Sequence, residues 1–214
     1  MIRGSATVDF NLYLITDRGQ TNRRDLLAVV EDALSGGVRA LQLREKALSG
    51  REYFELAQAM RALTDRYGAR LLINDRIDIA LAVEADGVHL SEAGLPLEVA
   101  RELLGSSKLI GVSCHSREKA LDAERRGADF ITFGPVWFTL SKADYGEPLG
   151  VALLAEVART LSIPVFALGG VTRERVPELQ ASGVHQVALI SAILAATAPR
   201  AEAETFTTLI DKAA

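Results

Sequence analysis

The sequence has little cysteine and no excess of positive charge, and both shortages exclude classes of protein. A single cysteine, Cys114, cannot form a disulfide within the chain, which is typical of a reducing compartment. The 24 Lys and Arg residues are outnumbered by 28 Asp and Glu, and the net charge is −4. Such a chain lacks the basic surface that nucleic acid or an anionic membrane requires, so neither is expected as a partner. Any site for an anion must therefore be local.

Long apolar runs are also missing. The first residues, MIRGSATVDFNLYLITD, have no apolar core of the kind found in signal peptides. No stretch approaches the ~18 apolar residues of a membrane span. We therefore expect a soluble protein of the cytoplasm. No tract rich in proline or serine divides the chain, so residues 1–214 are expected to form one domain.

The sequence does contain an alternation of short apolar runs and longer helical patterns. Segments such as DLLAVVEDALSGG repeat apolar residues three and four apart and close with glycine, which predicts amphipathic helices. Eight short runs predict strands at 12–16, 38–44, 70–73, 86–90, 108–113, 129–133, 164–168 and 185–190. This alternation predicts a (β/α)8 TIM barrel of the α/β class. A doubly wound open sheet is the alternative, but its G-x-G-x-x-G turn is missing from the first connection, ITDRGQTNRRD.

Polar side chains follow the predicted strands at the ends where barrel enzymes carry their chemistry. They are Gln42, Arg44 and Lys46 after the second strand, Asn74 and Asp75 after the third, His89 and Glu92 after the fourth, and Ser113 and His115 after the fifth. The later loops read GPVWFTLSKADYG, GGVT and ISAI. We expect these groups to meet at one end of the barrel.

The stretch LQLREK in the second strand alternates apolar and polar residues with the two-residue period of a strand. Alternate residues of a barrel strand point into the barrel, so Gln42, Arg44 and Lys46 are predicted to line its mouth. Two cations at that place suit a phosphate. A ladder of ion pairs with Glu45 and Glu52 is the alternative interpretation.

Three later loops have features of anion sites. ALGGVT combines two glycines with the start of a helix, where backbone N–H groups can bind an anion. LISAI has a similar helix start, with Ser191 as the expected N-cap. Loops seven and eight form the usual phosphate site of this fold. Loop six adds two hydroxyls and an ammonium, from Thr139, Ser141 and Lys142. Two anion sites indicate two phosphorylated ligands, or one ligand with a phosphate at each end.

Asp75 and Cys114 each allow two interpretations. Asp75 is a candidate Mg²⁺ ligand, because Mg²⁺ takes one or two carboxylates together with phosphate oxygens, but a helix N-cap explains the same residue. Ser113 and His115 are two residues apart and are expected to face the lumen together, which turns Cys114 away. This argues against a Cys–His nucleophile and for a buried structural thiol.

The ordered motifs LYLITD, LQLREK, INDRIDIAL, ADGVHL, IGVSCHS, GADFITFGPVWFTLSK, PVFALGGVT and VALISAI resemble those of the thiamine phosphate synthase and thiazole tautomerase family along nearly the whole chain. The resemblance implies a (β/α)8 barrel enzyme of thiamine biosynthesis. In the synthase, the nitrogen of a thiazole phosphate displaces diphosphate from aminomethylpyrimidine diphosphate through a carbocation-like species. The synthase carries Mg²⁺ on the leaving group.

The resemblance also implies roles for individual residues. It places Gln42, Arg44, Lys46, Asn74 and Lys142 on the pyrimidine diphosphate, Asp75 on the metal, and Ser113 beside the diphosphate or pyrimidine. It places Thr139, Ser141, Gly170, Ile190 and Ser191 on the thiazole phosphate. Lys142, Ser113, His115 and Arg44 are the residues expected to act in catalysis. Cations already in place suit a reaction in which charge develops on a leaving anion.

One position departs from the synthase pattern. The second metal aspartate of the family is expected five residues after His89, where this chain has Gly94. Glu92, two residues earlier, is the substitute candidate for the second Mg²⁺ ligand. The tautomerase also lacks that aspartate, and it uses a histidine at the position of His115 to move a proton on a carboxythiazole phosphate.

Retention of REK, ND and Lys142 favours the synthase, with the metal-free tautomerase as the second hypothesis. A catalytically silent phosphate-binding protein and a sugar-phosphate isomerase on the same barrel are weaker alternatives, because fold and family do not by themselves fix activity. Homo-oligomerisation stays open.

Overall fold

The computed structural model describes residues 7–139 and 147–211, and the strands in this part of the chain close into a barrel. Eight parallel strands follow one another in chain order around the closed sheet. They are β1 Leu12–Ile15, β2 Ala40–Leu43, β3 Arg70–Asn74, β4 Gly87–Leu90, β5 Leu109–Cys114, β6 Phe130–Phe133, β7 Val165–Leu168 and β8 Gln186–Leu189. The predicted (β/α)8 barrel is confirmed, and each predicted strand is found within two residues of its expected bounds.

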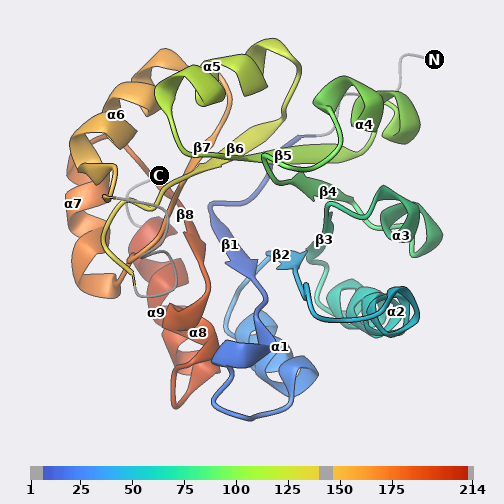
Figure 1. The fold of residues 1–214 in the computed structure, drawn as a ribbon. Helices are drawn as coiled ribbons and strands as arrows, with labels where there is room; N and C mark the ends of the chain where they lie inside the picture. The colour runs from blue at the N-terminus through green and yellow to red at the C-terminus, as the bar shows by residue number, and fades with distance from the viewer. Residues whose placement is uncertain (1–6, 140–146, 212–214) are drawn as a thin grey trace.

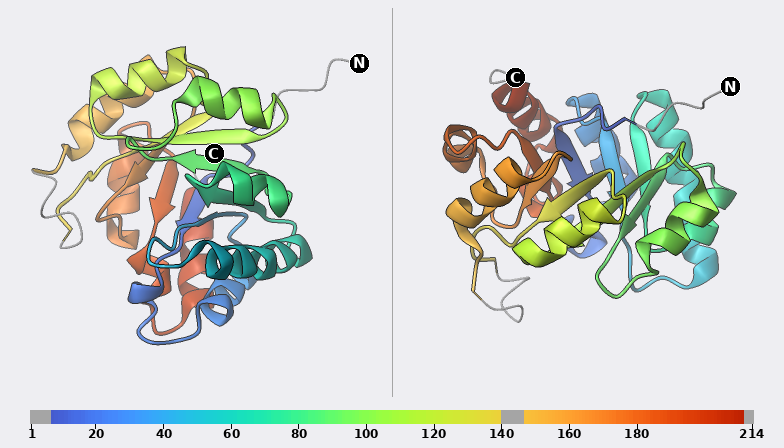
Figure 2. Two further views of the ribbon diagram at one scale, coloured as in Figure 1. Left: turned by 45° about the vertical axis from the view of Figure 1, so that its right-hand side comes forward. Right: turned by 90° about the horizontal axis from the view of Figure 1, so that it is seen from above.

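Helices cover the outside of this sheet, as Figures 1 and 2 show from three directions. They are η1 Arg18–Gln20, α1 Leu26–Ser35, α2 Gly50–Arg66, α3 Ile77–Ala82, α4 Leu97–Leu104, α5 Arg117–Arg125, α6 Gly150–Thr160, η3 Arg173–Arg175, α7 Val176–Ala181, α8 Ser191–Leu194 and α9 Pro199–Asp211. The parallel pairing of β1 with β8 joins the two ends of the sheet. Across residues 7–139 and 147–211, no helix combines the length and apolar character needed to cross a membrane.

Local side-chain caps fix where several helices begin. Asp25 accepts a hydrogen bond from the backbone of Ala28 at the start of α1. Ser49 and Glu52 form a reciprocal capping box at the start of α2. Such caps satisfy backbone N–H groups that the first helical turn leaves without partners.

Two apolar cores lie on opposite sides of the sheet. Alternate strand residues such as Leu41 and Leu43 are fully buried in the outer core between strands and helices. The inner core fills the amino-terminal part of the lumen with aromatic rings, among them Tyr13, Phe130 and Phe166. The ring centroids of Phe130 and Phe166 are 5.3 Å apart, a distance typical of packed aromatic pairs. These rings fill one end of the lumen, and two cavities open toward the carboxyl ends of the strands.

Candidate active site

Two adjoining cavities open at the carboxyl ends of the strands. The larger, called the central cavity, has a volume of about 670 Å³, and its lining includes Gln42, Arg44, Lys46, Asn74, Glu92, Ser113 and His115. The second, called the side cavity, has a volume of about 370 Å³, and its lining includes Thr139, Gly170, Ile190 and Ser191. Both linings share Gln20, His115, Pro135, Leu168 and Ile190. One wall therefore separates a chamber that contains Arg44 and Lys46 from a glycine-rich one.

The cations of the second strand face the central cavity without carboxylate partners. Within the described residues, no carboxylate oxygen lies within 4.0 Å of the side-chain nitrogens of Arg44 or Lys46. Glu45 is instead buried and pairs with Arg18 at 3.3 Å. Glu52 is engaged by Ser49 at the start of α2. The alternative of an ion-pair ladder is therefore wrong for the described part of the chain, and positive charge is left available to an anion.

Asp75 is held by the loop that follows β4. Its Oδ1 accepts a hydrogen bond from the backbone nitrogen of Ser91 at 2.7 Å, and its Oδ2 accepts one from the Ser91 hydroxyl at 2.9 Å. The side chain of Asn74 donates a third at 3.0 Å. The N-cap position of α3 belongs to Arg76, so the helix-cap interpretation of Asp75 is wrong. The carboxylate instead ties the ends of β3 and β4 together.

Ser113 and His115 face the lumen together, as their spacing predicts, and both line the central cavity. His115 donates from Nδ1 to the carbonyl oxygen of Gly134, which fixes the direction of its ring. Cys114 points the other way and is only 1% exposed. Burial, together with the negative charge of Glu92, raises the pKa of the Cys114 thiol to about 12. A thiol of this kind is a poor nucleophile at neutral pH.

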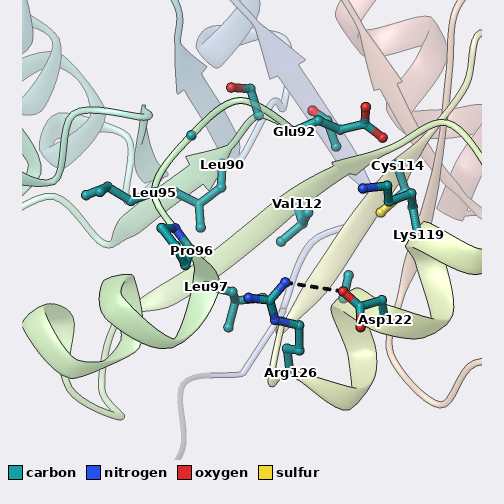
Figure 3. Close-up of a pocket in the computed structure, with 14 residues that line it drawn as sticks. Leu90, Glu92, Leu95, Pro96, Leu97, Val112, Cys114, Lys119, Asp122 and Arg126 are labelled. Carbon is teal, nitrogen blue, oxygen red and sulfur yellow. Dashed lines mark hydrogen bonds and ion pairs between the residues drawn. The ribbon is translucent and has the colours of Figure 1, made fainter.

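Cys114 borders a third cavity, which has a volume of about 230 Å³ and lies between α4 and α5. Figure 3 shows Cys114 beside Lys119 and Glu92, with Asp122 paired to Arg126 at the opposite end. Positive and negative side chains are mixed along this lining.

Glycine shapes the side cavity where β7 ends. Gly170 has a φ of +69°, and a Cβ atom there would lie 2.7 Å from Cβ of Trp137. Both observations favour glycine, which has no Cβ and tolerates positive φ. The absence of a side chain lets a ligand approach the backbone closely. Ser191 lines the same cavity but is the first residue of α8, with Ile190 at the N-cap, so the expectation that Ser191 caps this helix is wrong.

Arg175 is a cation of the side cavity that the sequence analysis missed. Its Nη1 donates to the carbonyl oxygen of Gly170 at 2.5 Å, and its guanidinium lies 5.0 Å from the ring centroid of Trp137. The stretch TRER also contains Arg173, which is exposed and pairs with Glu174. Only the turn geometry of η3 decides which arginine lines the cavity, and the sequence contains no clear signal for that choice.

Gln20 was also missed, and it lines both cavities. Its Nε2 donates to Oδ2 of Asp17 at 3.0 Å. Asp17 caps η1 by accepting a hydrogen bond from the backbone of Gly19 at 2.9 Å. The short helix therefore places an amide where the two cavities meet.

Comparison with known proteins decides which barrel family this is. A sequence profile described as thiamine monophosphate synthase matches residues 12–193. The chain belongs to the thiamine monophosphate synthase family. A Geobacter sulfurreducens protein provisionally named a thiamine-phosphate synthase is 63% identical over 205 residues, which cover 96% of each chain. The thiamine-phosphate synthase of Clostridium novyi is 46% identical over 187 residues, covering 87% of this chain and 92% of that one.

A solved structure agrees with this family. The thiamine phosphate pyrophosphorylase of Pyrococcus furiosus is 36% identical, with a TM-score of 0.86, over 95% of this chain and 96% of that one. A 3-hexulose-6-phosphate synthase superposes with a TM-score of 0.69 at 17% identity, over 94% of this chain and 99% of that one. At that identity only the barrel fold is shared.

The family implies Mg²⁺, and the residues at the ends of β3 and β4 fit it. The described residues hold no group of three or more His, Cys, Asp or Glu side chains arranged for a metal. Mg²⁺ needs fewer, because it takes one or two carboxylates and completes its shell with phosphate oxygens and water. Asp75 could supply one carboxylate, and its Oδ1 lies against Gly94, 2.6 Å from where a Cβ atom of residue 94 would stand. Glu92 lines the central cavity nearby.

Two residues that the family resemblance assigns, Ser141 and Lys142, lie outside the described residues. The anion clamp expected in loop six is therefore represented here by Thr139 alone, which lines the side cavity.

Proposed function

We propose that this chain joins aminomethylpyrimidine diphosphate to thiazole phosphate, giving thiamine phosphate and diphosphate, and that residues 1–214 act as one barrel domain. The observation that carries the proposal is the pair of adjoining cavities, one containing Arg44 and Lys46 and the other rich in glycine. A reaction between two phosphorylated molecules requires two anion sites that share an opening. Membership of the thiamine monophosphate synthase family supports the same conclusion.

The reaction breaks one bond and forms one. The bond between the methylene carbon of the pyrimidine and the diphosphate oxygen breaks, and its electron pair leaves with the diphosphate. The lone pair of the thiazole nitrogen then forms the new carbon–nitrogen bond. The protein has to stabilise the negative charge that develops on the leaving group and to hold the thiazole in line.

The central cavity is assigned to the pyrimidine diphosphate. Arg44, Lys46 and Asn74 line it and are placed to donate hydrogen bonds to the diphosphate. Gln42 lies deeper in the lumen, only 2% exposed, and is assigned to the pyrimidine end. Lys142 joins this set by its position in the family pattern. Because these groups are in place before the bond breaks, they stabilise the departing charge without rearranging.

The side cavity is assigned to the thiazole phosphate. Thr139, Gly170, Ile190 and Ser191 line it, and their backbone groups and the hydroxyl of Thr139 are assigned to the phosphate. Ser141 is added by its position in the family pattern. Arg175 supplies a positive charge in the same lining and is assigned to the phosphate.

Mg²⁺ is the metal that thiamine-phosphate synthases use. Asp75 and Glu92 would hold it beside the diphosphate, where it would neutralise charge on the leaving group. Asp75 has a second task that needs no metal, because its hydrogen bonds to Ser91 fix the loop after β4.

His115 separates the synthase from the tautomerase experimentally. Displacement by a nitrogen lone pair needs no general base, so His115→Ala should slow the synthase without abolishing it, whereas a tautomerase would lose its acid–base group. The test supplies the two synthase substrates with Mg²⁺, and separately the carboxythiazole phosphate without metal. We expect thiamine phosphate from both wild type and His115→Ala. Metal-free aromatisation that depends on His115, with no thiamine phosphate, would overturn the proposal.

A further inference from the structure

A chain of polar side chains crosses the lumen beneath the central cavity. Nε2 of Gln42 lies 3.2 Å from Oη of Tyr13, and that oxygen lies 3.4 Å from Nδ1 of His89. On the other side of the ring, Nε2 of His89 lies 3.1 Å from Oγ of Ser113. Thr132 is a weaker partner of the same nitrogen at 3.4 Å. These side chains link five strands, β1, β2, β4, β5 and β6, beneath the cavity.

Space for the imidazole ring is created by a glycine on the neighbouring strand. Gly111 pairs with His89 across β4 and β5, and a Cβ atom there would lie 2.6 Å from Nδ1 of His89 and 2.4 Å from Cζ of Phe130. His89 itself is only 1% exposed. The ring is therefore enclosed by strand backbone and aromatic side chains, and it has little freedom to turn.

One assignment of donors and acceptors is consistent along this whole series of hydrogen bonds. The amide of Gln42 donates to Tyr13, so the single phenolic proton is left to donate to Nδ1 of His89. A ring that accepts a hydrogen bond at Nδ1 is the neutral form, because both nitrogens of the protonated ring donate. The neutral ring carries its proton on Nε2 when Nδ1 accepts, and Nε2 then donates to Oγ of Ser113. The hydroxyl proton of Ser113 must point elsewhere, and Ser113 lines the central cavity.

We propose that His89 is a positioning residue that turns the hydroxyl proton of Ser113 into the central cavity. This inference rests on the proposed function, because the hydroxyl would donate a hydrogen bond to the diphosphate as it leaves. No proton is transferred. Ser113 stabilises the charge, and His89 and Tyr13 act only through it.

A double-mutant cycle tests the coupling. Ser113→Ala should lower kcat about tenfold, because it removes one hydrogen bond to a developing charge. Tyr13→Phe should lower kcat about three- to tenfold. In the Ser113→Ala background, Tyr13→Phe should cause no further loss of kcat, because its effect passes through Ser113. Tyr67→Phe is the matched control, since it removes a phenolic hydroxyl that contacts Glu31 at 3.3 Å outside the site, and it should leave kcat unchanged. If the fold-losses in kcat of the two single variants multiply in the double variant Tyr13→Phe/Ser113→Ala, the proposal is overturned.

The ring tautomer provides a readout that does not depend on activity. The chain has three histidines, so ¹⁵N-labelled histidine can be assigned by single His→Gln variants. We expect the Nε2-protonated tautomer for His89 in the wild type, and a loss of that preference in Tyr13→Phe. A proton on Nδ1 in the wild type would overturn the proposal even if thiamine phosphate is made. Failure to make thiamine phosphate would count against the proposed function, and the tautomer would still decide the orientation of Ser113.

Folding of the variants is checked in the same series. His89→Gln keeps a donor and an acceptor and should recover much of the kcat that His89→Leu loses, at a similar melting temperature. Equal loss in both variants, with both folded, would show that orientation of Ser113 does not depend on residue 89.

Discussion

A Cβ atom at Gly94 would lie 2.6 Å from Oδ1 of Asp75 and 3.1 Å from the carbonyl oxygen of Ser91. The position where the family pattern expects a second metal aspartate therefore adjoins the first one directly. The side chain of an aspartate at residue 94 would therefore begin beside the carboxylate of Asp75. In this chain, Asp75 alone occupies that place.

Gly94→Asp should therefore behave differently with and without Mg²⁺. Without metal, two adjacent carboxylates and a crowded Cβ should lower the free energy of unfolding by about 1–3 kcal/mol. Mg²⁺ should restore stability by binding between them, and should raise synthesis at low metal concentration. Thermal melts and rates across a Mg²⁺ titration measure both effects, with Gly94→Asn as the uncharged control. Identical melting and identical Mg²⁺ response in the Asp and Asn variants would show that no metal binds there.

Arg44→Met should weaken pyrimidine diphosphate binding without unfolding the protein. The side chain of Arg44 has no carboxylate within 4.0 Å in the described part of the chain, so its loss breaks no ion pair. The KM for the pyrimidine diphosphate should rise about 10- to 100-fold, as expected for a hydrogen bond to a charged group.

The matched control for Arg44 is Arg70→Met, at the other end of the barrel. Arg70 pairs with Asp9 at 2.8 Å and Asp86 at 3.4 Å. Its loss should lower the melting temperature and leave KM unchanged. A stability loss for Arg44→Met that equals the loss for Arg70→Met, with no change in KM, would mean that Arg44 is structural.

Gly170→Ala should impair the thiazole phosphate site selectively. The new Cβ would lie 2.7 Å from Trp137, at a φ of +69°. Gly183→Ala provides the control, because it has a φ of +86° with nothing within 4 Å of its Cβ. Both variants should lose about 1–2 kcal/mol of stability from the strained backbone. Only Gly170→Ala should also raise the KM for thiazole phosphate, and a matching rise for the pyrimidine diphosphate would point to general misfolding.

Cys114 should resist thiol reagents in the folded protein. A pKa of about 12 for Cys114 means that only about one molecule in ten thousand carries the thiolate at pH 8. The disulfide reagent DTNB should therefore react only after unfolding in guanidinium, and Cys114→Ser should show no reaction in either state. Release of one equivalent of chromophore from the native protein, at the rate of a free cysteine, would contradict this burial.

Much of this architecture was predictable because its signals are local. The strands were found from short apolar runs, and the alternation of Leu41 and Leu43 with Gln42 and Arg44 gave the inward face of β2 correctly. Ser113 and His115 were placed in the lumen by the same two-residue period. The two-residue period of a strand is enough to assign these side chains, because alternate residues of a barrel strand face the lumen and the surrounding helices.

What could not be predicted depends on contacts between distant residues. Tyr13 and His89 are 76 positions apart, and no local pattern shows that their side chains meet. The attachment of Asp75 to Ser91 was missed for the same reason, so a residue read as a metal ligand or a helix cap also fixes a loop. Arg175 was missed because the conformation of the short helix η3 decides that Arg175, and not Arg173, lines the side cavity.

Joint release of the two products tests the central claim most directly. The chain should be mixed with aminomethylpyrimidine diphosphate, thiazole phosphate and Mg²⁺, and thiamine phosphate and diphosphate should be quantified together over time. We expect the two products to appear in equal amounts, and their formation to be lost in Asp75→Asn. Absence of thiamine phosphate from the wild-type reaction, or diphosphate released without it, would contradict the account.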